Sequence, residues 1–140
     1  MKIERMIKIQ GLQRNQEGEE NKIELSTMGS VYEKNNNVYV VYEETEISGM
    51  EGTTTTLKIE GTNRLSMQRY GNTTSKMVFE EGKRHISDYR TLYGDFKMEV
   101  VTSSLNIKLD VEGLKGSLEL HYDLSISGLV ESQNLLTICF

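Results

Sequence analysis

The ten residues Ser117–Ile126 (SLELHYDLSI) decide the fold class of this chain. Apolar side chains occupy every second position, namely Leu118, Leu120, Tyr122, Leu124 and Ile126. Because successive side chains of a β-strand point to opposite faces, this period of two predicts a strand with one buried side. Glu119, His121 and Asp123 occupy the other side, which is therefore expected in water. A charged outer side excludes a membrane barrel, whose outer side is apolar.

Similar strand patterns continue along the whole chain and are separated by polar or Gly- and Asn-containing turns. Turn signals at intervals of roughly 8–14 residues are typical of an antiparallel sandwich or barrel. Phe96–Val111 is expected as one long strand or as two, and Gln13–Asn21 and Ser127–Asn134 are expected as loops. The other expected strands are Met1–Leu12, Lys22–Tyr32, Val38–Ile47, Thr53–Glu60, Arg64–Tyr70, Thr74–Glu80, Arg84–Leu92 and Leu135–Phe140.

The composition favours an all-β protein. The 140 residues include no Pro, no Trp and no Ala, and Ala is the best helix former. Short connections pair neighbouring strands as hairpins, and closing such a meander removes its exposed edges. We therefore predict one domain spanning residues 1–140, folded as a single antiparallel up-and-down β-barrel of about eight to ten strands. A meandering sandwich is the second choice.

The inward side of the long segment changes in its middle. Phe96, Met98 and Val100 share one parity, whereas Leu105 and Ile107 share the other. A one-residue change of parity predicts a β-bulge or a sharp bend near Ser103 and Ser104. Six large side chains are expected to point inward, and together they are large enough to fill a small barrel: Met67, Met77, Phe79, Phe96, Met98 and Tyr122.

Two arginines interrupt the apolar parity. Arg69 continues the inward parity of Leu65 and Met67, and Arg5 lies between Ile3 and Ile7. An isolated buried charge costs several kcal/mol, so each arginine is expected to reach a rim, to pair with a carboxylate or to bind an anion. The expected carboxylate partners of Arg69 are Glu43, Glu44 and Glu46.

The sequence contains no recognisable catalytic motif. The two histidines, His85 and His121, lack zinc-site spacing. The single cysteine, Cys139, forms no intramolecular disulfide and is expected to be dispensable. A net charge of −5 argues against nucleic-acid binding. No metal and no cofactor are expected, and an enzyme is the minority interpretation.

No stretch approaches the length of an apolar membrane helix, and the first residues, Met1–Gln10, lack the apolar core of a secretory signal. We therefore expect a cytoplasmic protein without a membrane partner.

Six stretches of the chain form a recognisable pattern. They are Thr54–Ile59, Arg69–Gly71, Met77–Gly82, Tyr89–Gly94 (YRTLYG) with the following Phe96–Met98, Gly116–Ile126 and Asn134–Ile138. Together, and in this order, they resemble the YwiB-like family of small bacterial proteins of unknown function. The resemblance implies a calycin-type, lipocalin-like barrel in the bacterial cytoplasm, and it supplies no site residues.

The sequence leaves the function open between three classes. The first is a non-enzymatic barrel that binds a small apolar or amphipathic ligand, with Arg69, Arg5, Tyr89 and Tyr122 as the candidate ligand-binding residues. The second is a structural or regulatory protein with a filled barrel and a protein partner. The third is an enzyme. A homodimer is left open, and a lumen of several hundred Å³ would favour the first class over the second.

Overall fold

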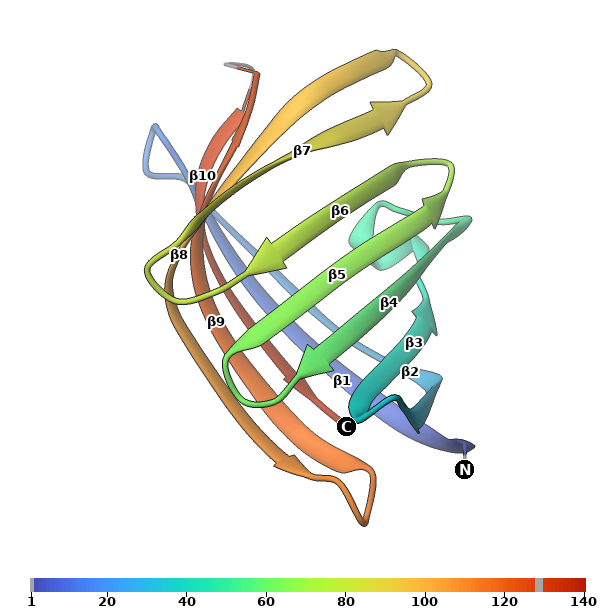
Figure 1. Ribbon diagram of the computed structural model, residues 1–140. Coiled ribbons are helices and arrows are strands. Elements are labelled where there is room, and N and C mark those ends of the chain that lie inside the picture. Colours follow the sequence, from blue (N-terminus) through green and yellow to red (C-terminus); the bar gives the residue numbers. More distant parts are fainter. Residues whose placement is uncertain (1, 128–129) are drawn as a thin grey trace.

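A computed structural model describes residues 2–127 and 130–140. Ten strands and one short 3₁₀-helix lie within these residues (Figure 1). Their bounds are β1 (Lys2–Asn15), β2 (Glu20–Lys34), β3 (Asn37–Glu43), η1 (Glu46–Ser48), β4 (Thr53–Glu60), β5 (Arg64–Gly71), β6 (Thr74–Phe79), β7 (Arg84–Thr91), β8 (Gly94–Asp110), β9 (Lys115–Ile126) and β10 (Val130–Cys139).

The strands form a closed barrel in which each strand pairs antiparallel with its neighbours in the chain. β1 and β10 close the ring through a register that runs from Lys8↔Cys139 to Asn15↔Ser132. The prediction of an all-β, up-and-down barrel is therefore confirmed, and the chain does not adopt the sandwich that was the second choice. We call the end that carries η1 and the β1–β2, β5–β6 and β7–β8 turns the upper end.

Three predicted boundaries were wrong. Of the loop expected at Gln13–Asn21, residues 13–15 belong to β1 and residues 20–21 belong to β2. β3 ends at Glu43, and the expected strand residues Glu46 and Ile47 belong to η1, which the Thr45 hydroxyl caps. Of the loop expected at Ser127–Asn134, residues 130–134 belong to β10, whereas residues 128 and 129 lie outside the described residues. The inward positions Ser132 and Asn134 carry polar side chains, which hid the alternation.

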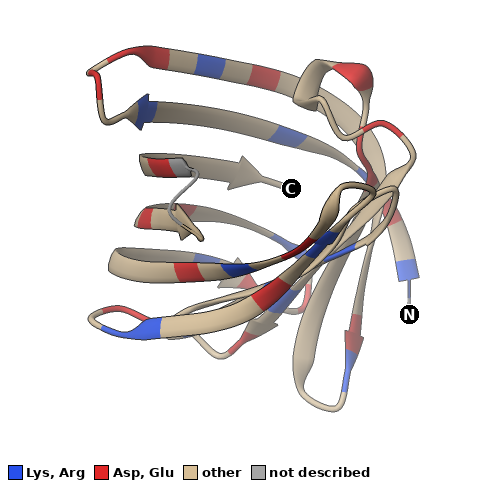
Figure 2. Ribbon diagram, turned by 90° about the horizontal axis from the view of Figure 1, so that it is seen from above, with Lys and Arg blue, Asp and Glu red and all other residues tan. Residues whose placement is uncertain are grey.

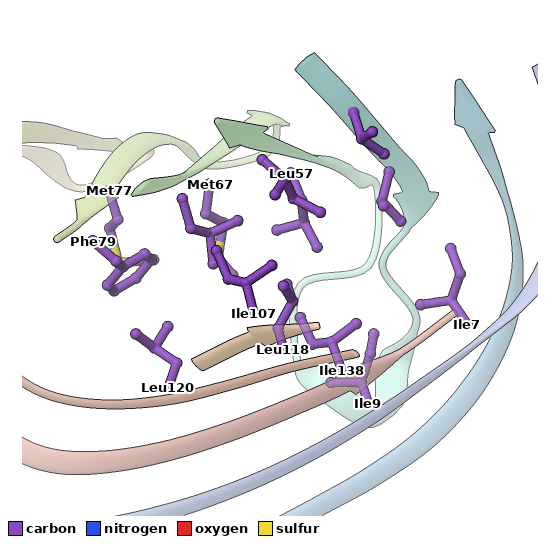
Figure 3. Packing of buried hydrophobic residues seen from close by; sticks show 14 of the residues in the cluster. Ile7, Ile9, Leu57, Met67, Met77, Phe79, Ile107, Leu118, Leu120 and Ile138 are labelled. Carbon is purple, nitrogen blue, oxygen red and sulfur yellow. The ribbon is translucent and has the colours of Figure 1, made fainter. Parts of the chain in front are cut away.

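Apolar side chains fill the lower half of the barrel in layers. One layer runs across four strands through the register partners Val38, Ile59, Leu65 and Phe79. The layer above it runs through Val40, Leu57, Met67 and Met77. Figure 3 shows side chains of opposite walls pointing toward one another in this core. All eight of these side chains are at most 4% exposed, as expected for close-packed interiors.

The β8–β9 turn lies at the lower end of the barrel. Leu114 in this turn has a φ of 48° and is 3% exposed. Arg5 holds the turn, because its Nε donates to the Leu114 carbonyl at 2.8 Å and its Nη2 donates to the Gly113 carbonyl at 2.6 Å. Gly116 and Phe140 exchange two backbone hydrogen bonds of 2.9 Å beside it. The turn is therefore fixed against the lower end of the barrel, with Leu114 buried.

The predicted bulge is confirmed. The register between β8 and β9 shifts between Thr102 and Ser104, so one extra residue reverses the parity of β8.

The weakest pairing in the ring lies between β6 and β7. Only Thr74↔Arg90 and Ser75↔Tyr89 pair there, whereas β7 and β8 are joined from Arg84↔Val101 to Thr91↔Gly94. The turn between β6 and β7 bonds to β8 instead, since the Gly82 N–H donates to the Thr102 carbonyl at 2.8 Å. In Figure 1 a gap separates the ribbons of β6 and β7.

Candidate functional site

A cavity of about 280 Å³ occupies the upper half of the barrel. Its walls combine apolar side chains from most of the strands with a few polar ones, and Ser48 and Met50 reach it from η1 and the segment after it. Glu44 and Arg69 are the two charged residues in its lining. The other charged residues of both signs are distributed around the barrel, as the view from above shows (Figure 2).

A polar row lies directly above the two apolar layers, and Tyr42, Arg69, Ser75 and Tyr89 of this row line the cavity. The row consists of the register partners Tyr42, Thr55, Arg69, Ser75 and Tyr89 on β3 to β7. Because each strand repeats its inward side every two residues, these side chains lie at one level of the barrel. The packing therefore changes from hydrocarbon to hydrogen-bonding groups at this level.

Arg69 of the polar row and Glu44, which follows the end of β3, form the charged centre of the cavity wall. The Arg69 Nε lies 3.8 Å from the Glu44 Oε1, and the side chains are 18% and 2% exposed, respectively. Thr55 donates a hydrogen bond of 2.6 Å to the Glu44 Oε1 and accepts one of 3.4 Å from the Arg69 Nε. Within the described residues, the two Nη atoms of Arg69 donate no hydrogen bond to the protein. The outer half of the guanidinium is therefore available to another molecule.

Two tyrosines of the cavity lining, Tyr42 next to this pair and Tyr122 on the opposite wall, are held in the neutral form. Burial raises the pKa of Tyr42 well above its ordinary value, and the adjacent Glu44 carboxylate raises this pKa further. Burial also raises the pKa of Tyr122, while the positive charge of Arg69 works against this shift. Both phenols are therefore neutral hydrogen-bonding groups in the lumen at neutral pH.

The opposite wall carries a second polar row. Asn21, Gln13, Asn134 and Tyr122 are register partners on β2, β1, β10 and β9, and all four line the cavity. Asn134 is tied to its own strand, because its Nδ2 donates to the Ser132 Oγ at 3.0 Å. The upper lumen is thus bordered by uncharged amides and a phenol on the side away from the Arg69–Glu44 pair.

Methionines form much of the apolar lining. Four of the seven methionines of the chain, Met50, Met67, Met77 and Met98, line the cavity. The unbranched thioether side chain adapts to irregular shapes and tolerates different partners. These walls suit an apolar group whose shape is not narrowly specified.

The structure brings together three of the four predicted ligand-binding residues. Arg69, Tyr89 and Tyr122 line the cavity, and the predicted pairing of Arg69 with a nearby glutamate is confirmed, with Glu44 as the partner. Arg5 lies at the lower end, where it holds the β8–β9 turn. The assignment of Arg5 to the same site was wrong, because parity identifies the side of a strand but not the level along it.

Sequence reasoning missed the inward polar residues Ser75, Gln13, Asn21 and Asn134. A signal was present for Ser75, since it continues the inward parity of Met77 and Phe79. For the other three, the polar side chain itself led to the prediction of a loop.

The remaining chemistry-bearing side chains lie outside the cavity. The His85 Nε2 is 3.3 Å from the Glu80 carboxylate, and the His121 Nε2 is 3.5 Å from the Glu119 carboxylate. Lys83, which contacts Glu80 at 3.2 Å, contributes most to the lowered pKa of that carboxyl group. Cys139 is exposed.

The residues that the structure describes contain neither a candidate metal site nor a membrane-spanning helix. Over residues 2–127 and 130–140, the His, Cys, Asp and Glu side chains form no group of three or more that could hold a metal ion. Within the same residues, no helix has the length and apolar character needed to cross a bilayer.

Comparisons with known proteins agree with the barrel. Residues 7–138 match the family model described as a domain of unknown function, DUF1934. A curated relative, the uncharacterised β-barrel protein YwiB of Bacillus subtilis (strain 168), is 29% identical over 125 residues, which are 89% of this chain and 84% of the relative. The crystal structure of the B. subtilis YwiB protein matches with a TM-score of 0.82 at 22% identity, covering 99% of this chain and 92% of the other.

Proposed function

The chain belongs to the DUF1934 family, and we propose that it is a non-enzymatic binding protein that holds one small amphipathic molecule in the upper half of its barrel. The observation that carries this proposal is the cavity of about 280 Å³ beside an arginine whose Nη atoms have no partner among the described residues. An unused guanidinium fork in a partly apolar enclosure is a ready partner for an acceptor group of a ligand.

The size of the cavity limits the ligand. Water occupies about 30 Å³ per molecule in the liquid, so the cavity corresponds to the volume of roughly nine water molecules. It lies near the lower end of ligand pockets, which measure about 300–1,000 Å³. We therefore propose a compact ligand of about ten non-hydrogen atoms.

The cavity also separates this proposal from its main alternative. A structural or regulatory protein that acts through its outer surface needs no empty lumen, and its barrel can be filled completely. The lower half of this barrel is filled in that way, whereas the upper half is not.

The proposed compartment remains the cytoplasm, where a protein with a single cysteine needs no disulfide within itself.

Two measurements test the proposal. Native mass spectrometry of protein purified from its own cell should detect a retained small molecule at one per chain. Calorimetric titration with octan-1-ol and octanoate should show saturable binding of at least one of them. The inward substitution Ser75→Met should weaken this binding at least tenfold, whereas the outward control Ser26→Met should leave it unchanged. A protein that retains no small molecule and binds no amphipathic probe, whether neutral, charged or zwitterionic, contradicts the proposal.

A further inference from the structure

The two charges in the cavity wall narrow the class of ligand. Resting on the proposed function, we infer that the ligand is a zwitterion of the α-amino acid type: a carboxylate on Arg69, an ammonium group on Glu44 and an apolar side chain in the methionine-lined part of the lumen. This inference rests on the position of Glu44, because its negative charge and the positive charge of Arg69 give the cavity lining a net charge of zero.

A simple anion is a poor match for this site. A carboxylate that binds Arg69 also lies near the Glu44 carboxylate, because the two side chains are only 3.8 Å apart at Nε and Oε1. Glu44 is 2% exposed, so water cannot screen the repulsion between the two carboxylates. A simple cation meets the corresponding repulsion from Arg69.

A zwitterion satisfies both charges at once. The carboxylate and the ammonium group of an α-amino acid are attached to the same carbon, so their separation is short, as is the separation of Arg69 from Glu44. The charged pair in the wall then becomes a quartet of alternating sign. Like-charge contacts exclude singly charged competitors, which gives selectivity by repulsion as well as by attraction.

The neighbours of Arg69 add hydrogen-bonding groups for a carboxylate. Ser75 is the register partner of Arg69 and is 4% exposed, and Tyr89 is the next partner along the row. The Thr73 hydroxyl also belongs to the lining, and it is buried without a hydrogen-bond partner among the described residues. A buried hydroxyl without a partner is costly, and a ligand oxygen at this point would remove that cost.

The apolar walls accommodate the side chain of such a ligand. Met67 and Met77 form the floor below the polar row, and Met98 faces them from β8. Leucine, methionine and phenylalanine have about the number of atoms that the cavity volume permits. Because methionine walls adapt, we expect affinity for several apolar amino acids and not for one alone.

A series of ligands with similar alkyl chains and different heads tests the inference. The probes are 2-aminooctanoate, octanoate, octylamine and octan-1-ol, each titrated by calorimetry into the full-length protein. We expect 2-aminooctanoate to bind at least tenfold more tightly than octanoate and octylamine.

Substitutions of the two charges should exchange these preferences. In Glu44→Gln the site carries a net positive charge, so octanoate should become the tighter ligand. In Arg69→Met it carries a net negative charge, so octylamine should become the tighter ligand. The double variant Glu44→Gln/Arg69→Met leaves no charge buried and should prefer octan-1-ol, and it keeps the test available if Arg69→Met does not fold. The matched control is Glu43→Gln, an exposed neighbour that should retain the wild-type order.

The outcomes separate this inference from the proposed function. If octanoate or octan-1-ol binds most tightly to the wild type, or if the substitutions do not change the order, the barrel is a binding protein but the zwitterion is wrong. If none of the four probes binds, the proposed function itself fails, and the inference fails with it.

Discussion

Replacing Arg69 by Met removes the positive charge beside a buried carboxylate while keeping the length of the side chain. At the 3.8 Å that separates Nε from the Glu44 Oε1, an effective dielectric constant of 20 gives a Coulomb attraction of about 4 kcal/mol. Glu44 keeps its hydrogen bond from Thr55 in the variant, so part of this stabilisation remains. We expect the free energy of unfolding to fall by about 3 kcal/mol, the lower end of the cost of breaking a buried pair.

Urea denaturation followed by far-ultraviolet circular dichroism measures this loss. For a chain of this size, a loss of about 3 kcal/mol corresponds to a decrease in Tm of roughly 10 °C. The double variant Arg69→Met/Glu44→Gln should recover most of the loss, because no unpaired buried charge remains. The matched control is Arg64→Met, whose pairs with Glu60 and Glu80 lie at the surface and should cost less than about 1 kcal/mol.

Two results together would refute this reasoning. The first is that Arg69→Met unfolds at the same urea concentration as the wild type. The second is that adding Glu44→Gln to this variant does not raise its free energy of unfolding. Arg69 would then contribute nothing to the stability of the empty barrel, and its charge would be retained for a ligand alone.

Four further predictions follow from other parts of the molecule. Arg5→Met should lower the free energy of unfolding in urea by about 2 kcal/mol, because two turn carbonyls lose a charged donor. The raised pKa values of Tyr42 and Tyr122 mean that the folded state keeps two phenolic protons that the unfolded state loses above pH 10. The contribution of these two groups to stability should therefore be constant below pH 10 and fall as the pH rises further, and Tyr42→Phe should weaken this alkaline loss in a series of thermal melts. Among the amides of the strands, those in the unpaired parts of β6 and β7 should exchange hydrogen fastest. Protection of these amides equal to that of the β4 amides would contradict the register. Cys139→Ser should change stability by less than about 1 kcal/mol in the same urea experiment, because this side chain is exposed.

The alternation of apolar and polar side chains predicted most of the fold because the barrel wall has a buried inner face and a solvent-exposed outer face. The strand Thr53–Glu60 has the predicted bounds, and the parity change near Ser103 is the bulge that the structure contains. These predictions needed only the local chain and the contrast between water and core. The closure of β1 on β10 was inferred from the cost of open edges, since no local pattern specifies it.

The sequence predicted the site less well because a cavity lining lacks that contrast. In the upper half of the barrel many inward positions of the strands carry amides and hydroxyls, whereas in the lower half they carry hydrocarbon side chains. Residues 130–134 were therefore expected in a loop, although Ser132 is 6% exposed and Asn134 faces the lumen. The alternation was therefore interrupted because the strand lines the cavity there, and the interruption was interpreted as a loop.

The two arginines show what additional information the site required. Arg5 and Arg69 both interrupt an inward apolar parity, and the local sequence offers no reason to treat them differently. Their roles differ because β1 starts at the lower end of the barrel, where the β8–β9 turn presents free carbonyls, whereas Arg69 lies near the upper end of β5, where Glu44 and the cavity meet it. The direction of each strand and the register around the ring determine how far from the lower end of the barrel each arginine lies. A parity pattern becomes a prediction of a binding site only after the register has placed each interrupted position at the filled or at the open end of the barrel.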